Sequence, residues 1–121
     1  LLYSWYNTEY LGGAHGLSGI IYLLLKISQH PSFVHLQPYI ESHLLPTVEY
    51  LKLKAFPSGN YMSSNDSNSD DLVQWCHGAT GFVFMFVQAY QEIDRIDSPV
   101  AFDHFDLRLG DEESVVFEPS D

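Results

Sequence analysis

The hydrophobic positions of the chain recur at helical spacing in three segments. In residues 16–29, the apolar residues Leu17, Ile20, Ile21 and Leu24 follow the i, i+3, i+4, i+7 spacing of a helix face. Other apolar residues fill most of the remaining positions of this segment. The pattern therefore predicts a helix that is buried among others on nearly all sides.

Two further helices are predicted downstream. The first spans about residues 34–54, with an apolar stripe formed by Ile40, Leu44, Leu45, Val48 and Leu51. Pro46 lies inside this segment, which predicts either a kink or the start of a second helix. The last helix spans about residues 79–94, with apolar positions at Phe82, Val83, Met85, Phe86, Ala89, Tyr90 and Ile93. Because strand signals are weak throughout, we expect an all-α domain.

The segments between the helices carry loop signals. His30-Pro31-Ser32 separates the first two predicted helices, and residues 56–61 form a turn-rich connector. Residues 63–71 consist of Ser, Asn and Asp alone, which predicts an exposed, mobile loop. Helical periodicity ends near Ile96. We therefore expect a helical domain over residues 1–95 and a divergent, poorly ordered acidic tail over residues 96–121.

Composition narrows the classes of function. The net charge is −11, from 16 acidic and 5 basic residues, which argues against binding nucleic acid or anionic lipid. The longest apolar run, residues 20–25, is far shorter than the roughly 18 residues of a membrane span, so no transmembrane segment is expected. A single cysteine excludes an intrachain disulfide and fits a reducing compartment.

Two short motifs share one pattern. Ala14-His15-Gly16-Leu17-Ser18-Gly19 and Cys76-His77-Gly78-Ala79-Thr80-Gly81 both read x-His-Gly-x-x-Gly, and each runs into an apolar stretch. The offset of 62 residues between His15 and His77 accommodates two helices with their loops. This spacing is typical of helical hairpins arrayed around a ring or along a stack.

The two motifs also hold the residues best suited to chemistry. Cys76 precedes a predicted helix start, where the helix dipole favours a thiolate that binds metal or attacks an electrophile; a small buried apolar role fits equally well. His15 is a candidate general acid or base, although a hydrogen-bonding role in its loop is the simpler interpretation. Cys76 and His77 alone do not complete a zinc site, which needs three or four protein ligands.

Several segments resemble one family of proteins. Residues 10–20 resemble the first signature of the lanthionine synthetase C-like (LanC-like) proteins, and residues 72–79 resemble the second, which residues 88–90 continue. Residues 56–61 resemble a connector found in eukaryotic members. The resemblance covers about residues 3–95 in the order and spacing of the family.

The resemblance implies a fold and a chemistry. The fold is an (α/α) toroid of helical hairpins with zinc at its centre. By this resemblance Cys76 is a zinc ligand, His15 is the acid–base group, and His77 lines the active site without binding the metal. Bacterial members add a peptide cysteine to dehydroamino acids. Eukaryotic members are linked to the addition of glutathione to dehydroamino acids in damaged proteins. We expect a cytoplasmic location from the free cysteine, and the resemblance adds association with the inner face of the plasma membrane, as in some members.

The departures from the family pattern lead to further expectations. The third signature, which carries the remaining zinc ligands, does not occur in the sequence, and the acidic tail does not resemble the family. We therefore expect a partial chain that is inactive alone, with a full-length relative that is a thioether-forming enzyme. One alternative is a non-catalytic member that binds glutathione or a protein partner. A glycosidase, another enzyme class built on (α/α) toroids, ranks last because the acids gather in the polar loop and the tail.

Overall fold

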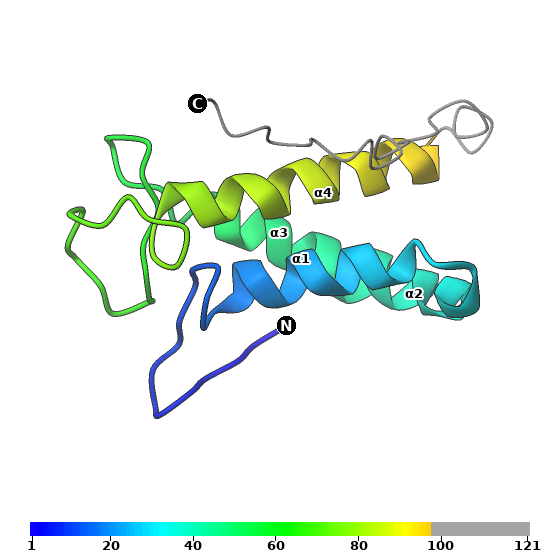
Figure 1. Cartoon of the computed structure of the whole chain (residues 1–121), viewed down its shortest axis with the longest axis horizontal. Helices are drawn as coiled ribbons and strands as arrows, with labels where there is room; N and C mark the ends of the chain where they lie inside the picture. Colours follow the sequence, from blue (N-terminus) through cyan, green and yellow to red (C-terminus); the bar gives the residue numbers. More distant parts are fainter. Residues whose placement is uncertain (98–121) are drawn as a thin grey trace, which may run out of the picture.

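The computed structural model describes residues 1–97 of the chain, and these residues are mainly helical (Figure 1). The elements are α1 (Leu17–Ser28), the 3-10 helix η1 (Pro31–Leu36), α2 (Gln37–Tyr39), the π-helical turn η2 (Ile40–Leu44), α3 (Leu45–Lys52) and α4 (Ala79–Asp97). Within this part of the chain the only β structure is isolated bridges, such as Tyr10 with Ser64. The predicted all-α class is confirmed. The acidic tail lies outside the described residues, apart from Ile96 and Asp97, which continue α4.

The helices pass back and forth along one axis. Figure 1 shows α1 and α4 side by side and running in the same direction, while the helical run of residues 31–52 returns in the opposite direction. The loops that precede α1 and α4 consequently meet at the same end of the bundle. This arrangement brings the two x-His-Gly-x-x-Gly motifs together.

The predicted helix over residues 34–54 is a helical run that changes pitch. It starts at Pro31, where His30 Nδ1 accepts a hydrogen bond of 3.2 Å from the Ser32 amide. It widens into the π turn of η2 just before Pro46, because proline has no N–H to continue the regular pattern. Pro46 is the second residue of α3, so the interpretation of Pro46 as part of a helix start describes the structure better than a simple kink does.

One apolar core joins the three passes. The stripe predicted for residues 34–54 is confirmed, with four of its positions buried and Leu45 packed against them. The core comprises Leu11, Leu17, Ile21, Leu25, Ile40, Leu44, Val48, Leu51, Phe82, Met85 and Ala89. Tyr61 stacks on Phe82 with ring centroids 4.4 Å apart, which fastens the connector to α4.

The prediction that residues 16–29 are buried on nearly all sides is wrong for the described part of the chain. Leu23, Leu24 and Ile27 of α1 are exposed, because α4 and the helical run of residues 31–52 cover only the opposite side of α1. Along α4, Val83 and Tyr90 are likewise exposed although both belong to the predicted apolar set. Within residues 1–97, no helix combines the length and apolar character that crossing a bilayer requires.

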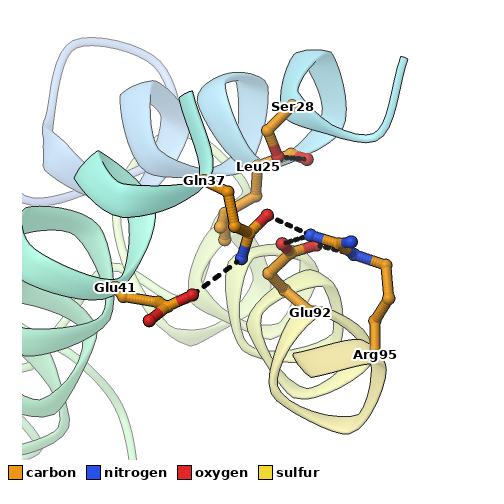
Figure 2. A network of polar contacts seen from close by, with 6 residues as sticks. All are labelled: Leu25, Ser28, Gln37, Glu41, Glu92 and Arg95. Atoms are coloured by element: carbon orange, nitrogen blue, oxygen red, sulfur yellow. Dashed lines mark hydrogen bonds and ion pairs between the residues drawn. The ribbon is translucent and has the colours of Figure 1, made fainter. Parts of the chain in front are cut away.

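A network of polar contacts, centred on an ion pair within α4, links the second half of α4 to α2 (Figure 2). Glu92 is fully buried, and the Arg95 guanidinium one turn further on donates hydrogen bonds to its carboxylate. Arg95 also donates to the side-chain oxygen of Gln37 at the start of α2, and Gln37 donates to Glu41 at 3.4 Å. The hydrogen bond with Glu92 and the negative charge of this residue raise the pKa of Arg95, while burial lowers it. The guanidinium therefore stays charged.

We expect Arg95→Met to lower the free energy of unfolding by roughly 3 kcal/mol, because it leaves the buried Glu92 carboxylate without a counter-ion. Adding Glu92→Gln should recover part of this loss. Urea unfolding followed by circular dichroism measures both effects. The matched control is Lys52→Met, which breaks an exposed pair with Glu49 and should change stability by less than about 0.5 kcal/mol. Equal losses from Arg95→Met and Lys52→Met would contradict the structural role of the buried pair.

Candidate functional site

The loops that carry the two motifs touch through their backbones. The Ala14 amide donates to the Cys76 carbonyl oxygen at 3.5 Å. A Cβ on Gly12 would collide with that same carbonyl oxygen, and one on Gly13 would lie 2.6 Å from the carbonyl oxygen of Trp75. Glycine at positions 12 and 13, just before the first motif, is thus explained by this contact, because no other residue lets the two backbone segments approach so closely.

The backbone contact brings the two motif histidines together. The ring centroids of His15 and His77 lie 6.2 Å apart, and Tyr10 lies 5.8 Å from His15 and 6.1 Å from His77. Trp5 stacks on the exposed ring of His15 with centroids 4.7 Å apart. His77 is half-buried, and among the described residues its Nδ1 atom has no hydrogen-bond partner. A buried nitrogen of this kind is normally satisfied by water, a ligand or further protein.

Cys76 lies in the same loop, half-buried, three residues before α4 begins. Its thiol donates to the side-chain oxygen of Gln74 at 3.4 Å. The Gln74 amide in turn donates to the His77 carbonyl oxygen at 2.9 Å, which closes a tight turn around Cys76. The structure thus places all three candidate residues from the sequence, His15, Cys76 and His77, on two loops in direct contact.

Asn60 holds the second of these loops, a role that the sequence analysis missed. Its side-chain oxygen accepts a hydrogen bond of 2.8 Å from the Ala79 amide and so caps α4. Its side-chain nitrogen donates to the Leu72 carbonyl oxygen at 3.0 Å and to the Asp70 carboxylate at 2.9 Å. The Asp70 carboxylate also accepts a hydrogen bond from the Ser58 hydroxyl at 2.6 Å. A capping residue is expected directly before its helix, so no local signal identifies Asn60.

The polar loop of residues 63–71 is only partly as predicted. Most of its second half is exposed, as expected. Its first residues pair with the N-terminal segment, since the Leu11 amide donates to the Ser63 carbonyl oxygen at 2.9 Å and the Asn65 amide to that of Glu9 at 3.0 Å. Ser64, between them, is buried. These hydrogen bonds attach the segment that precedes the first motif to the polar loop, which follows the connector that positions the second motif.

Zinc, which the resemblance implies, needs at least three protein ligands. Within residues 1–97, no group of three or more His, Cys, Asp and Glu side chains is placed to hold a metal ion. Cys76 is the only cysteine of the chain, and its thiol is directed toward an amide oxygen. Residues 1–97 by themselves therefore do not supply the complete ligand set of a zinc ion.

Comparison with known proteins supports the resemblance. The sequence model of the lanthionine synthetase C-like protein family matches residues 1–104. The chain belongs to this family. A family fold of helical hairpins in an (α/α) toroid accounts for the back-and-forth course of α1, residues 31–52 and α4.

Two relatives show the extent of the similarity. The LanC-like chain is 44% identical over 91 residues to the glutathione S-transferase LANCL1 of Danio rerio, an alignment that covers 75% of this chain and 22% of the relative. It is 38% identical over 92 residues to the LanC-like protein GCL1 of Arabidopsis thaliana, covering 75% of this chain and 20% of that protein. The chain thus spans about a fifth of the length of the curated relatives that it matches.

We expect Asn60→Ala to lower the free energy of unfolding by about 2 kcal/mol, because it removes the cap of α4 and two bonds that hold the Cys76 loop. The Cys76 thiol should then react faster with Ellman's reagent. Asn68→Ala, at an exposed asparagine of the polar loop, is the matched control and should leave both measurements unchanged. If Asn60→Ala and Asn68→Ala behave alike, Asn60 does not organise the loop.

We expect Gly81→Ala to destabilise the chain by roughly 2 kcal/mol. Alanine at a helix position normally stabilises it by about 1 kcal/mol relative to glycine. Here, however, the new Cβ would strike the carbonyl oxygen of Trp75. Thermal unfolding beside Thr80→Ala, an exposed neighbour on α4, measures the difference. A Gly81→Ala chain that melts at or above the parent's temperature would show that the segment carrying Trp75 moves away from α4 without cost.

Proposed function

We propose that residues 1–97 form part of a site that adds a thiol to a dehydroamino acid in a peptide or protein, producing a thioether. The observation that carries the proposal is the convergence of His15 and His77 from two equivalent loops, beside the backbone of Cys76. Membership in the LanC-like family supports it. The similarity to a protein named as a glutathione S-transferase supports glutathione as one thiol donor, with a peptide cysteine as the other.

The reaction requires a proton at a defined atom. The thiolate sulfur forms a bond to the β-carbon of the dehydroamino acid, and the electron pair of the C=C double bond moves toward the α-carbon and its carbonyl group. The enolate that results takes up a proton at the α-carbon, so that S and H are added across the double bond. A histidine is suited to this transfer, because it both donates and accepts protons near neutral pH.

His15 is the better placed of the two histidines for this proton transfer. Its ring is exposed at the end of the bundle, where an acceptor peptide can approach, and Trp5 holds it by stacking. His77 is half-buried, and its Nδ1 atom has no hydrogen-bond partner among the described residues. We propose that this atom binds the substrate directly, or binds His15 through a water molecule. Cys76 is proposed as one zinc ligand of the complete site, whose other ligands lie outside residues 1–97.

A chimera tests the proposal in a complete protein. Residues 1–97 replace the matching segment of the Danio rerio relative, and mass spectrometry follows glutathione addition to a dehydroalanine peptide. The chimera should retain activity, and His15→Gln within it should reduce the rate by at least 100-fold, in the range of a lost general acid. His43→Gln, at an exposed histidine whose side chain is hydrogen-bonded only to Ser42, is the matched control.

Two further measurements make this test decisive. Thermal unfolding of each chimera shows whether it is folded, and bound zinc per chain should fall from about one to none in Cys76→Ala. A folded chimera whose activity is unaffected by His15→Gln would contradict the role of His15. A folded chimera that binds glutathione without forming a thioether would favour the non-catalytic alternative.

A further inference from the structure

An apolar pocket adjoins the candidate site on the side of His15. It has a volume of about 440 Å³, and its wall includes the side chains of Tyr3, Trp5, His15, Tyr22, Leu23 and Trp75. A volume of this size is within the range of roughly 300–1,000 Å³ that is typical of ligand pockets. Neither Cys76 nor His77 contributes to the wall. The pocket is therefore a neighbour of the proposed reacting centre, with His15 common to both.

The chemistry of the wall restricts what the pocket can bind. No Lys, Arg, Asp or Glu is found among the described residues that line it. Glutathione carries two carboxylates and an ammonium group, and burying them without charged or hydrogen-bonding partners is costly. Two tryptophans and two tyrosines instead offer flat faces, against which an aromatic ring packs well.

The pocket is open and adjoins a second recess. Trp5 and Trp75 are 42% and 54% exposed, so part of each ring is accessible to a ligand. A smaller recess of about 170 Å³ shares Gly13, Gly19, Tyr22 and Trp75 with the pocket and adds Phe84 of α4. Gly13 and Gly19 line both spaces, and without side chains at these positions a ring can approach the backbone closely.

We propose that this pocket binds an aromatic side chain next to the dehydroamino acid in the acceptor peptide, and so selects the modified position. The inference rests on the proposed function, because a flanking residue has meaning only if the reacting residue lies at His15. The pocket and the proposed reacting centre share part of one wall, because Trp5 stacks on His15 and also lines the pocket. A side chain bound in the pocket would therefore lie beside His15, the residue proposed to protonate the neighbouring dehydroamino acid.

The chain carries its own reporter for this binding. Its two tryptophans both line the pocket, so intrinsic fluorescence responds to occupancy. Four short blocked peptides serve as probes on the 121-residue chain: dehydroalanine or alanine followed by phenylalanine, and dehydroalanine or alanine followed by serine. Both phenylalanine peptides should change the fluorescence with a Kd of about 0.1–1 mM, and both serine peptides should bind at least tenfold more weakly. Equal affinity for all four, or no change up to 10 mM of any, would overturn the proposal.

A variant and a rate measurement separate this proposal from the proposed function. Trp5→Ala should weaken the phenylalanine peptides at least fivefold by calorimetry, whereas Tyr90→Ala, an exposed aromatic of α4 that does not line the pocket, should not. In the chimera, the phenylalanine-flanked dehydroalanine should show at least a fivefold higher kcat/KM for glutathione addition than the serine-flanked one. Equal rates on both would refute the pocket and leave the thiol addition standing. Selective phenylalanine binding by an inactive chimera would support the pocket and refute the thiol addition.

Discussion

The candidate site depends on one constraint, the direct backbone contact between the two loops that carry the x-His-Gly-x-x-Gly motifs. The carbonyl groups of Trp75 and Cys76 occupy the space where side chains at Gly12 and Gly13 would lie. The contact itself contributes little energy, since its one backbone hydrogen bond, from Ala14 to Cys76, is 3.5 Å long and such a bond is weak. Packing between α1 and α4 must hold the loops together, because each buried Leu or Phe contributes roughly 1.5–3 kcal/mol. The glycines permit the approach, and the helices enforce it.

The parallel course of α1 and α4 explains why two similar motifs produce one site. Each motif precedes a helix, and both helices start at the same end of the bundle. Two features keep the second loop in place at that end. Asn60 caps α4 and binds the loop from behind, and the connector that contains Asn60 packs on α4 through the stacking of Tyr61 on Phe82. The polar contacts of Arg95 fasten the opposite half of α4 to α2. The candidate site is thus positioned by the whole length of α4.

Features that depend on the local sequence pattern could be predicted from the sequence. Features that depend on contacts between residues far apart in the chain could not. The helices, the stripe along residues 34–54 and the candidates His15, Cys76 and His77 follow from periodicity and from the repeated motif. The exposed outer face of α1 does not, because an apolar pattern shows what a helix is able to bury and not what lies beside it. The capping role of Asn60 could not be predicted for a similar reason, because Asn60 caps a helix that begins 19 residues later in the chain. The repeated motif shows only that His15 and His77 occupy equivalent positions. That the two histidines lie close together was expected from the resemblance to the LanC-like family and not from the repeat.

The segment before the first motif contains a strained turn that fixes the position of one side chain, Trp5. Tyr6 and Asn7 both have positive φ angles, 49° and 60°, between Trp5 and Thr8, whose backbones exchange two hydrogen bonds of 3.0 Å. A left-handed conformation costs a residue such as tyrosine on the order of 1 kcal/mol. Tyr6 itself is almost fully solvent-exposed, so little of this cost is recovered by its own burial. What the turn achieves is to direct Trp5 back onto His15, where one ring both orients the proposed proton donor and forms a wall of the adjoining pocket. Orientation of the histidine and binding of a flanking side chain are therefore physically coupled through Trp5.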